Sequence, residues 1–129
     1  MEDLNLDKMK RNIEENHTAN GENFNQEDRT QFAKYKIVTH VELQVDPHFI
    51  DEVISNAIKT KDLILLEEGT EIFRLTRKKE EPNTLVIFAV YTSQEFYGWH
   101  LEQVYVKSFF EFLNNKLLEA PNATYLEEI

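Results

Sequence analysis

The sequence contains no cysteine, only three glycines and one tryptophan, and no long apolar run. Without cysteine the chain can form no disulfide, no thiolate nucleophile and no Cys-ligated metal centre. The glycines, at positions 21, 69 and 98, lie far apart and form no glycine-rich phosphate loop. No run of about 18 apolar residues exists to span a membrane. The first eleven residues lack the apolar segment of a signal peptide. We therefore expect a cytoplasmic protein with no membrane partner.

Positive charge is also scarce. The chain has 14 basic and 24 acidic residues, for a formal net charge of −10. Nucleic acids attract proteins through a field of the opposite sign. The only candidate basic cluster, Arg74, Arg77, Lys78 and Lys79, falls at a predicted strand end, where charges usually mark a solvated turn. We therefore expect no nucleic-acid partner.

Residues 1–34 differ in composition from the rest of the chain. They are rich in Glu, Asp and Asn and poor in β-branched and aromatic residues, so they offer little apolar area to offset the entropy of ordering. Leu6, Met9 and Ile13 share one helical face. We predict an acidic, Asn-rich tail that is disordered or forms a short helix. The alternative is a helix that docks on the domain or covers its pocket.

Residues 35–129 are predicted to form a single α+β domain. Val41, Leu43 and Val45 alternate with polar residues, which indicates a half-buried strand. Asp46-Pro47 is a typical helix start, and apolar residues then recur at helical spacing up to Ile58. Further patterns predict strands at 70–77, 84–91 and 124–126 and helices at 95–99 and 101–118.

This order, βαββαβ, is typical of a ferredoxin-like antiparallel sheet with two helices on one face. The segment 84–91 is a nearly unbroken apolar run, which indicates a central strand with two buried faces. Two helices cover only one face of such a sheet. We therefore expect a homodimer that pairs two sheet faces.

Several short motifs, in order, carry a family resemblance. They are the strand 41–45, Glu67-Glu68-Gly69 ahead of a strand, Val90-Tyr91 followed by 92–95, Trp99-His100, and Ala120-Pro121 before the last strand. In this order and spacing the chain resembles the antibiotic-biosynthesis-monooxygenase (ABM) domains, including the quinol monooxygenases and autoinducer-2 degradation proteins. The resemblance covers about three quarters of the chain and leaves out the N-terminal tail.

The resemblance implies a dimeric α/β barrel with a pocket between sheet and helices. Many members oxidise phenolic or quinol substrates with dioxygen and without metal or flavin. Others act on small carbonyl compounds, and one branch degrades haem. We therefore expect a cofactor-independent monooxygenase acting on a small planar quinol, phenolic or carbonyl compound. The alternative is a non-catalytic module with the same dimeric scaffold that binds a small molecule or has a regulatory role.

The chain departs from the family pattern at three positions. Ala89 stands where members commonly carry a strand Glu, which weakens the case for an enzyme. Tyr105 stands where many relatives have a second His. His100 stands where the haem-degrading branch places a Trp, which disfavours haem degradation.

The candidate catalytic residues are His100 and Tyr105. Histidine titrates near neutral pH and can serve as a general base, whereas the structural alternative is a helix-start histidine bonded to a backbone carbonyl. Tyr105 can add a hydroxyl or can simply pack as a half-buried tyrosine. No metal is expected, because His40 and His100 lack metal-ligand spacing. The candidate pocket residues, with ordinary core or surface positions as the alternative, are His40, Phe73, Phe88, Tyr91, Trp99 and Phe109.

Overall fold

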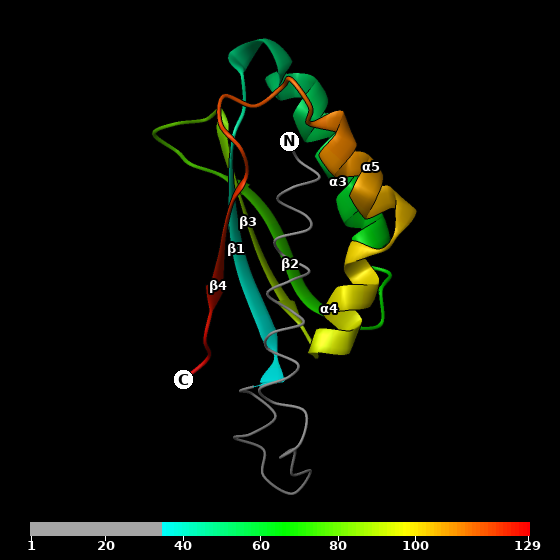
Figure 1. Cartoon of the computed structure of the whole chain (residues 1–129). Helices are drawn as coiled ribbons and strands as arrows, with labels where there is room; N and C mark the ends of the chain where they lie inside the picture. Colours follow the sequence, from blue (N-terminus) through cyan, green and yellow to red (C-terminus); the bar gives the residue numbers. More distant parts are fainter. Residues whose placement is uncertain (1–34) are drawn as a thin grey trace, which may run out of the picture.

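A computed structural model of the chain describes residues 35–129; the predictions made for residues 1–34 lie outside the described residues. Eight elements follow one another: β1 (Ile37–Gln44), η1 (Pro47–Phe49), α3 (Ile50–Ile64), β2 (Thr70–Arg77), β3 (Thr84–Tyr91), α4 (Gln94–Leu101), α5 (Val104–Phe112) and β4 (Asn122–Leu126). The strands form one antiparallel sheet in the order β2-β3-β1-β4. The helices lie together on one side of it (Figure 1).

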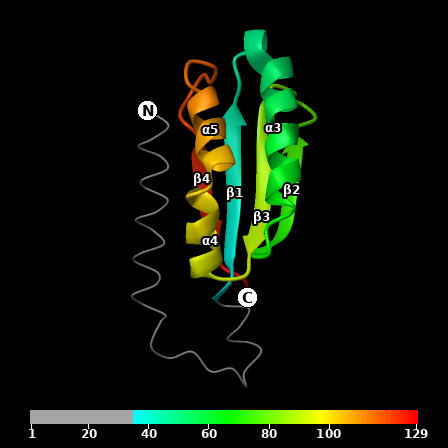
Figure 2. The ribbon, with the colours of Figure 1, turned by 90° about the vertical axis from the view of Figure 1, so that its right-hand side faces the viewer.

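The helices divide the covered face of the sheet between them. Figure 2 shows α3 over the β3–β2 side and α4 and α5, end to end, over the β1–β4 side. The result is the predicted ferredoxin-like α+β arrangement, and the sheet in this chain is open rather than closed into a barrel. Within residues 35–129, every helix is too short or too polar to span a lipid bilayer.

The predicted alternation in β1 is confirmed. Val41 and Leu43 are buried in the core beneath the helices, and their partners on β3 are Ile87 and Leu85. Directly paired residues of an antiparallel sheet share a face, so Glu42 and its partner Val86 lie on the opposite face. The hydrophobic pattern thus fixed which face of β1 turns inward.

The central position predicted for β3 is also confirmed. β3 pairs with β2 on one side and β1 on the other, and the bounds 84–91 match the apolar run. Its inner residues, including Ala89 and Tyr91, belong to the core cluster. Its outer residues Val86, Phe88 and Val90 are also apolar and face away from the helices.

The first helix begins as Asp46-Pro47 predicts. The Asp46 side chain accepts a hydrogen bond from the His48 backbone N–H, and Pro47 opens a single 3₁₀ turn before α3. From there α3 buries Val53, Ala57, Thr60 and Ile64. Their three- and four-residue spacing places them on one stripe against the sheet.

The predicted helix over residues 101–118 is wrong in extent. Ser93 caps the preceding helix, as the sequence suggests, but α4 continues to Leu101, and α5 occupies only Val104–Phe112. Gln103 has extended backbone angles (φ −69°, ψ 141°), which break the helix there. Asn115, with φ 65°, turns the chain after α5, since asparagine tolerates the left-handed region better than most residues. Leu113 still packs in the core, whereas Leu117 bridges to Val45.

Candidate functional site

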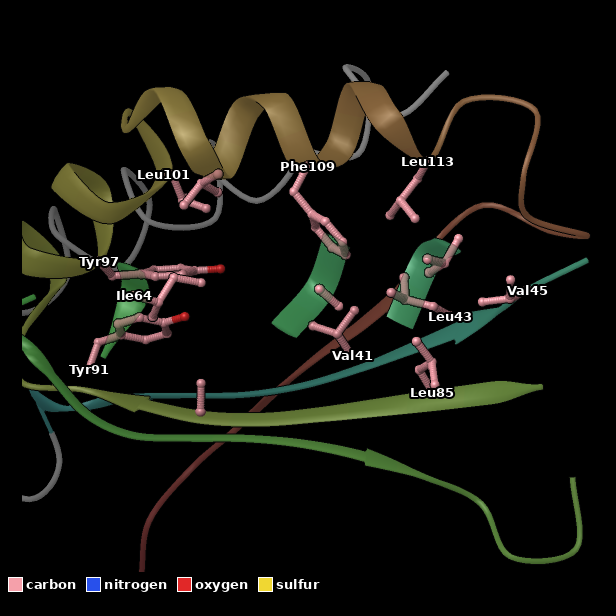
Figure 3. Close-up of a cluster of buried hydrophobic side chains, with 14 of the residues drawn as sticks. Val41, Leu43, Val45, Ile64, Leu85, Tyr91, Tyr97, Leu101, Phe109 and Leu113 are labelled. Atoms are coloured by element: carbon pink, nitrogen blue, oxygen red, sulfur yellow. The ribbon is translucent and has the colours of Figure 1, made fainter. Parts of the chain in front are cut away.

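A small cavity lies between the sheet and the helices. Its volume is about 60 Å³, enough for a few water molecules. Side chains from β1, α3, β2, β3, α4 and α5 line it, and among the described residues the lining includes no Lys, Arg, Asp or Glu. Figure 3 shows this region, with Val41 and Phe109 facing each other and the hydroxyls of Tyr91 and Tyr97 pointing inward from one end.

A histidine and a carboxylate form a buried pair at this polar end. Nδ1 of His100, on α4, lies 2.8 Å from Oε1 and 3.1 Å from Oε2 of Glu67, in the turn between α3 and β2. Only 4% of His100 and 8% of Glu67 is exposed. The two residues are 33 positions apart in sequence, so only the packing of α4 against the sheet brings them together.

Glu67 accepts further hydrogen bonds. Tyr105 donates its hydroxyl to Oε2 at 2.5 Å, and Thr70 donates to Oε1 at 2.7 Å. Burial by itself raises the pKa of Glu67, but the hydrogen bonds from His100, Tyr105 and Thr70 outweigh it and lower the pKa of Glu67 below its ordinary value. Glu67 is therefore a carboxylate at neutral pH.

The carboxylate determines which nitrogen of His100 is available for chemistry. Nδ1 must carry the proton that is donated to Glu67, which leaves the lone pair of a neutral imidazole on Nε2. Nε2 lies 3.1 Å from the Tyr91 hydroxyl. Burial raises the pKa of Tyr91 far above its ordinary value, so Tyr91 stays a phenol and donates to Nε2. A carboxylate-oriented imidazole with its second nitrogen toward an apolar cavity can act as a general base.

The break between α4 and α5 allows His100 and Tyr105 to share Glu67. In one continuous helix, residues five apart point about 140° away from each other. The extended backbone of Gln103 restarts the helix in a new orientation, and both side chains then reach the same carboxylate. The helix break at Gln103, which the sequence did not predict, is therefore the feature that lets His100 and Tyr105 reach the same carboxylate.

The predicted site residues fall into two groups. His100, Tyr91, Phe73 and Phe109 line the cavity, and Tyr105 joins them through its hydrogen bond to Glu67. The remaining three predicted pocket residues, His40, Phe88 and Trp99, do not line it.

The structure places each of these three elsewhere. His40 pairs with Phe88 on β3; both lie on the sheet face opposite the helices, because the core side of β1 is occupied by its neighbours Thr39 and Val41. Trp99 is 52% exposed and lies beside Glu68, Gly69, Glu95 and Phe96 in a separate surface hollow. Strand and helix periodicity could assign these residues to faces but could not show which face borders the cavity.

Sequence reasoning assigned no role to Glu67 or Tyr97. Glu67 stands in the Glu-Glu-Gly turn ahead of β2, and that motif was the available signal. Tyr97 is fully buried, lines the cavity and hydrogen-bonds through its hydroxyl to the Tyr125 hydroxyl at 3.1 Å. Ala89 is buried in the core, so the carboxylate beside His100 comes from the turn rather than from β3. Within residues 35–129, no group of three His, Cys, Asp or Glu side chains is arranged to hold a metal ion.

A close contact at Gly69 holds the Glu67 turn in place. A Cβ at Gly69 would overlap the Cβ and ring of Phe96, and the Gly69 carbonyl accepts a hydrogen bond from the Thr92 backbone N–H at 2.8 Å. We expect Gly69→Ala to destabilise the fold by about 1–3 kcal/mol, as overpacking usually does. Urea unfolding monitored by circular dichroism measures the change.

The matched control is the same substitution at Gly98. This glycine lies within α4, and nothing stands within 4 Å of the position that its Cβ would take. Gly98→Ala is expected to stabilise the fold by about 0.5–1 kcal/mol, since alanine favours helix interiors. Equal effects at both positions would contradict the role given to the Gly69–Phe96 contact.

Three tyrosines around the site are expected to make the stability of the fold depend on pH in alkaline solution. Burial is the main reason that the pKa values of Tyr91, Tyr97 and Tyr105 are all raised. A buried neutral tyrosine contributes fully to stability below the usual tyrosine pKa of about 10. This contribution is lost as pH rises through the raised pKa of the folded state, where the side chain would have to ionise inside the protein. We expect these three to ionise only as the fold is lost. Parallel phenolate absorbance and circular dichroism titrations test this; ionisation of all five tyrosines near pH 10 in a folded protein would refute it.

Comparison with solved structures supports the fold. A protein from Nitrosomonas europaea, named provisionally as an antibiotic biosynthesis monooxygenase, matches with a TM-score of 0.71 and 14% identity over 74% of this chain and 92% of its own. A conserved protein from Methanosarcina mazei Go1 matches with a TM-score of 0.71 and 18% identity over 75% of this chain and 96% of its own. A third protein, from Caulobacter crescentus CB15 and also named provisionally as an antibiotic biosynthesis monooxygenase, matches with a TM-score of 0.69 and 20% identity over 78% of this chain and 96% of its own.

At these identities the structural matches establish the fold alone. No curated protein matches the chain. The sequence model of one family, described as antibiotic biosynthesis monooxygenase, matches residues 36–111. This match spans more than half of the chain and includes Glu67, His100 and Tyr105. The chain therefore belongs to the antibiotic biosynthesis monooxygenase family.

Proposed function

We propose that this protein is a cofactor-independent monooxygenase acting on a small, planar phenolic or quinol compound, with His100 as the general base. The observation that carries the proposal is the buried Glu67–His100 pair at the polar end of an apolar cavity. The carboxylate orients the ring and stabilises the imidazolium that forms when Nε2 takes a proton. Family membership supports the reaction class.

The chemistry follows from the proton transfer. When His100 removes the acidic proton of the substrate, the electron-rich anion can give electrons to dioxygen directly. In the net reaction a CH₂ carbon of the reduced ring system gains one oxygen atom and loses two hydrogen atoms; in a phenol the oxygen atom goes to an aromatic C–H carbon, and the two hydrogen atoms come from that carbon and from the O–H group. The second oxygen atom of dioxygen leaves as water. The apolar walls keep water from the intermediate.

The cavity restricts which substrates can enter. In this state its volume is about 60 Å³, so a ring-sized substrate must widen it. The Tyr91 hydroxyl occupies the Nε2 position that a substrate hydroxyl needs, and the substrate must displace it or bond through it. Because the described lining has no Lys or Arg, we expect neutral substrates rather than carboxylates or phosphates.

Oxygen uptake tests the proposal. The full-length protein is assayed with a panel of hydroquinones and phenols of one to three rings, and isotopically labelled dioxygen shows whether one oxygen atom enters the product. Uptake with incorporation of one labelled atom supports the proposal. Binding of these compounds by calorimetry without turnover would instead support the alternative, a non-catalytic binding module, for which the occupied Nε2 of His100 is the favouring observation.

The protein is further proposed to be a homodimer through its outer sheet face. Besides Phe88 and its apolar strand neighbours, this face carries Ile72 and Leu126, which are exposed large hydrophobics. Two open sheets facing each other would bury it and complete a barrel. Light-scattering mass measurement at several concentrations is expected to give a dimer, and Phe88→Glu a monomer; a wild-type monomer throughout would contradict this.

A cytoplasmic location remains a prediction.

A further inference from the structure

Four aromatic side chains connect the cavity to the edge of the sheet. The ring centroids of Tyr91 and Tyr97 are 4.7 Å apart, and those of Tyr91 and His100 are 4.8 Å apart. Figure 3 shows Tyr91, from the sheet, and Tyr97, from α4, lying one above the other with their hydroxyls pointing the same way. The centroid of Tyr97 is in turn 6.1 Å from that of Tyr125 on β4. Such distances are typical of directly interacting rings.

Each tyrosine in this series has a partner for its hydroxyl. The Tyr91 hydroxyl faces Nε2 of His100 at 3.1 Å, and the Tyr97 hydroxyl faces the Tyr125 hydroxyl at 3.1 Å. A phenol that loses an electron becomes strongly acidic and must release its proton at once. Nε2 can take the proton of Tyr91, because Glu67 stabilises the resulting imidazolium.

The series runs from the buried site to solvent. Tyr91 and Tyr97 are only 3% and 1% exposed. Tyr125 is partly exposed, on a strand that pairs on one side only, with β1. The three side chains come from β3, α4 and β4, and the core packing between these elements keeps them in contact.

We infer that Tyr91, Tyr97 and Tyr125 form a chain that carries a one-electron oxidising equivalent between the cavity and the surface, with His100 as the proton acceptor of Tyr91. This is an activity additional to oxygenation. It requires the ring contacts and the two hydroxyl contacts together, and it uses Tyr97 and Tyr125, which the proposed oxygenation does not require.

The steps balance as follows. A one-electron oxidant in the cavity takes an electron from Tyr91, whose proton moves to Nε2 and leaves a neutral tyrosyl radical. Tyr91 recovers an electron from the adjacent Tyr97 ring and its proton from His100. The oxidised Tyr97 passes its proton to solvent through the hydroxyl of the partly exposed Tyr125, and it then takes a hydrogen atom from Tyr125 across the same contact. A thiol or ascorbate in solution then reduces the Tyr125 radical, supplying one electron and one proton.

The oxidant in the cell would be a substrate-derived peroxyl radical; this part rests on the proposed function. Its conversion to the hydroperoxide takes an electron from Tyr91 and the proton that His100 removed from the substrate, which frees Nε2 to accept the Tyr91 proton. A reaction of dioxygen with an organic anion passes through radicals that can damage the buried side chains around it. The chain would remove a stray oxidising equivalent from the cavity before such damage occurs.

Flash oxidation of the full-length protein tests the chain without any substrate. Photogenerated tris(bipyridine)ruthenium(III) oxidises surface residues, and electron paramagnetic resonance detects the radical that remains. Trp99→Phe serves as the background, because this exposed tryptophan would compete for the oxidant. We expect a long-lived neutral tyrosyl radical that is lost in Tyr91→Phe, and also in Tyr97→Phe, which interrupts the route. Ring-deuterated tyrosine identifies the signal as tyrosyl.

Two further variants separate the chain from a general effect on folding. Tyr35→Phe removes a tyrosine outside the series and is expected to leave the signal unchanged. His100→Gln keeps Tyr91 but removes its proton acceptor and is expected to abolish the long-lived signal. A signal of unchanged yield and lifetime in folded Tyr91→Phe or Tyr97→Phe would overturn the inference. Since no substrate is present, this outcome leaves the oxygen-uptake result untouched, and failure of oxygen uptake leaves the radical chain untouched.

Discussion

Replacing His100 by glutamine is expected to lower kcat for oxygen uptake by about 10²- to 10⁴-fold, the usual contribution of a positioned general base. Glutamine is close to histidine in size and can still bond to Glu67, so the cavity should keep its shape. It has no basic nitrogen to replace Nε2, which faces the cavity and the Tyr91 hydroxyl. The loss should therefore fall on kcat more than on KM. Steady-state uptake with the best substrate of the panel measures both constants.

The control for this experiment is His48→Gln. The His48 side chain is 87% exposed, and its Nδ1 lies 2.8 Å from Oδ1 of Asp46 at the start of the helix. His48→Gln makes the same chemical change at an exposed position and is expected to leave kcat unchanged. If His100→Gln retained wild-type kcat, His100 would not be the base, and the Glu67–His100 pair would be a structural feature of the core.

Replacing Glu67 by alanine is expected to destabilise the fold by at least about 1.5–3 kcal/mol, the usual contribution of one hydrogen bond to a charged group. The carboxylate accepts hydrogen bonds from His100, Tyr105 and Thr70 at once. Without it, the buried Nδ1–H of His100 loses its acceptor, and an unpaired buried donor is costly. Urea unfolding of the two proteins at pH 7 gives the difference.

The neighbouring glutamate provides a matched control. Glu68 is exposed, and Glu68→Ala should change stability by no more than about 0.5 kcal/mol. A loss at Glu67 no larger than that at Glu68 would show that the buried network does not stabilise the fold.

The Glu67 contribution also has a pH signature. Because the pKa of Glu67 is lowered in the fold, its contribution is present above the unfolded pKa of about 4.3 and is lost as pH falls through the folded value. The stability difference between wild type and Glu67→Ala should therefore shrink in acid. Unfolding curves measured from pH 7 downward follow it.

Much of the fold could be predicted from local pattern. The strands at 70–77 and 84–91 were predicted with the bounds that the structure shows, because hydrophobic periodicity and turn residues are local properties. The order of elements then left few topologies to consider. The inward-facing residues of β1 followed from strict alternation, since a shift by one position would expose its apolar side chains.

The helix over residues 101–118 could not be predicted correctly from the same kind of pattern. Its apolar stripe is real, because Val106, Phe109 and Leu113 are all in the core. The break at Gln103 carries no proline or glycine signal. Tertiary packing sets it: α4 and α5 must each lie against the sheet while His100 and Tyr105 both reach Glu67.

The candidate site divides in the same way. His100 was found from the sequence, because a histidine in this motif stands out by residue type and family position. Glu67 was assigned no role, because its contact with His100 spans 33 residues and no local pattern records such a distance. His40 and Phe88 were predicted to be pocket residues, but the structure places them on the sheet face opposite the helices, because alternation distinguishes two faces of a strand without saying which one borders the cavity.

The sequence by itself thus determined the α+β class, the order of the elements and the central position of β3, and it indicated His100 as the candidate base. These features depend on periodicity, caps and residue type, which neighbouring residues set. The tertiary structure alone decided that Glu67, Tyr105 and Tyr91 converge on His100, which of its nitrogens carries the proton, and that Tyr97 and Tyr125 extend the site to the surface. Those features depend on how helices pack against the sheet, because burial and hydrogen bonding between distant segments exist only in the folded chain.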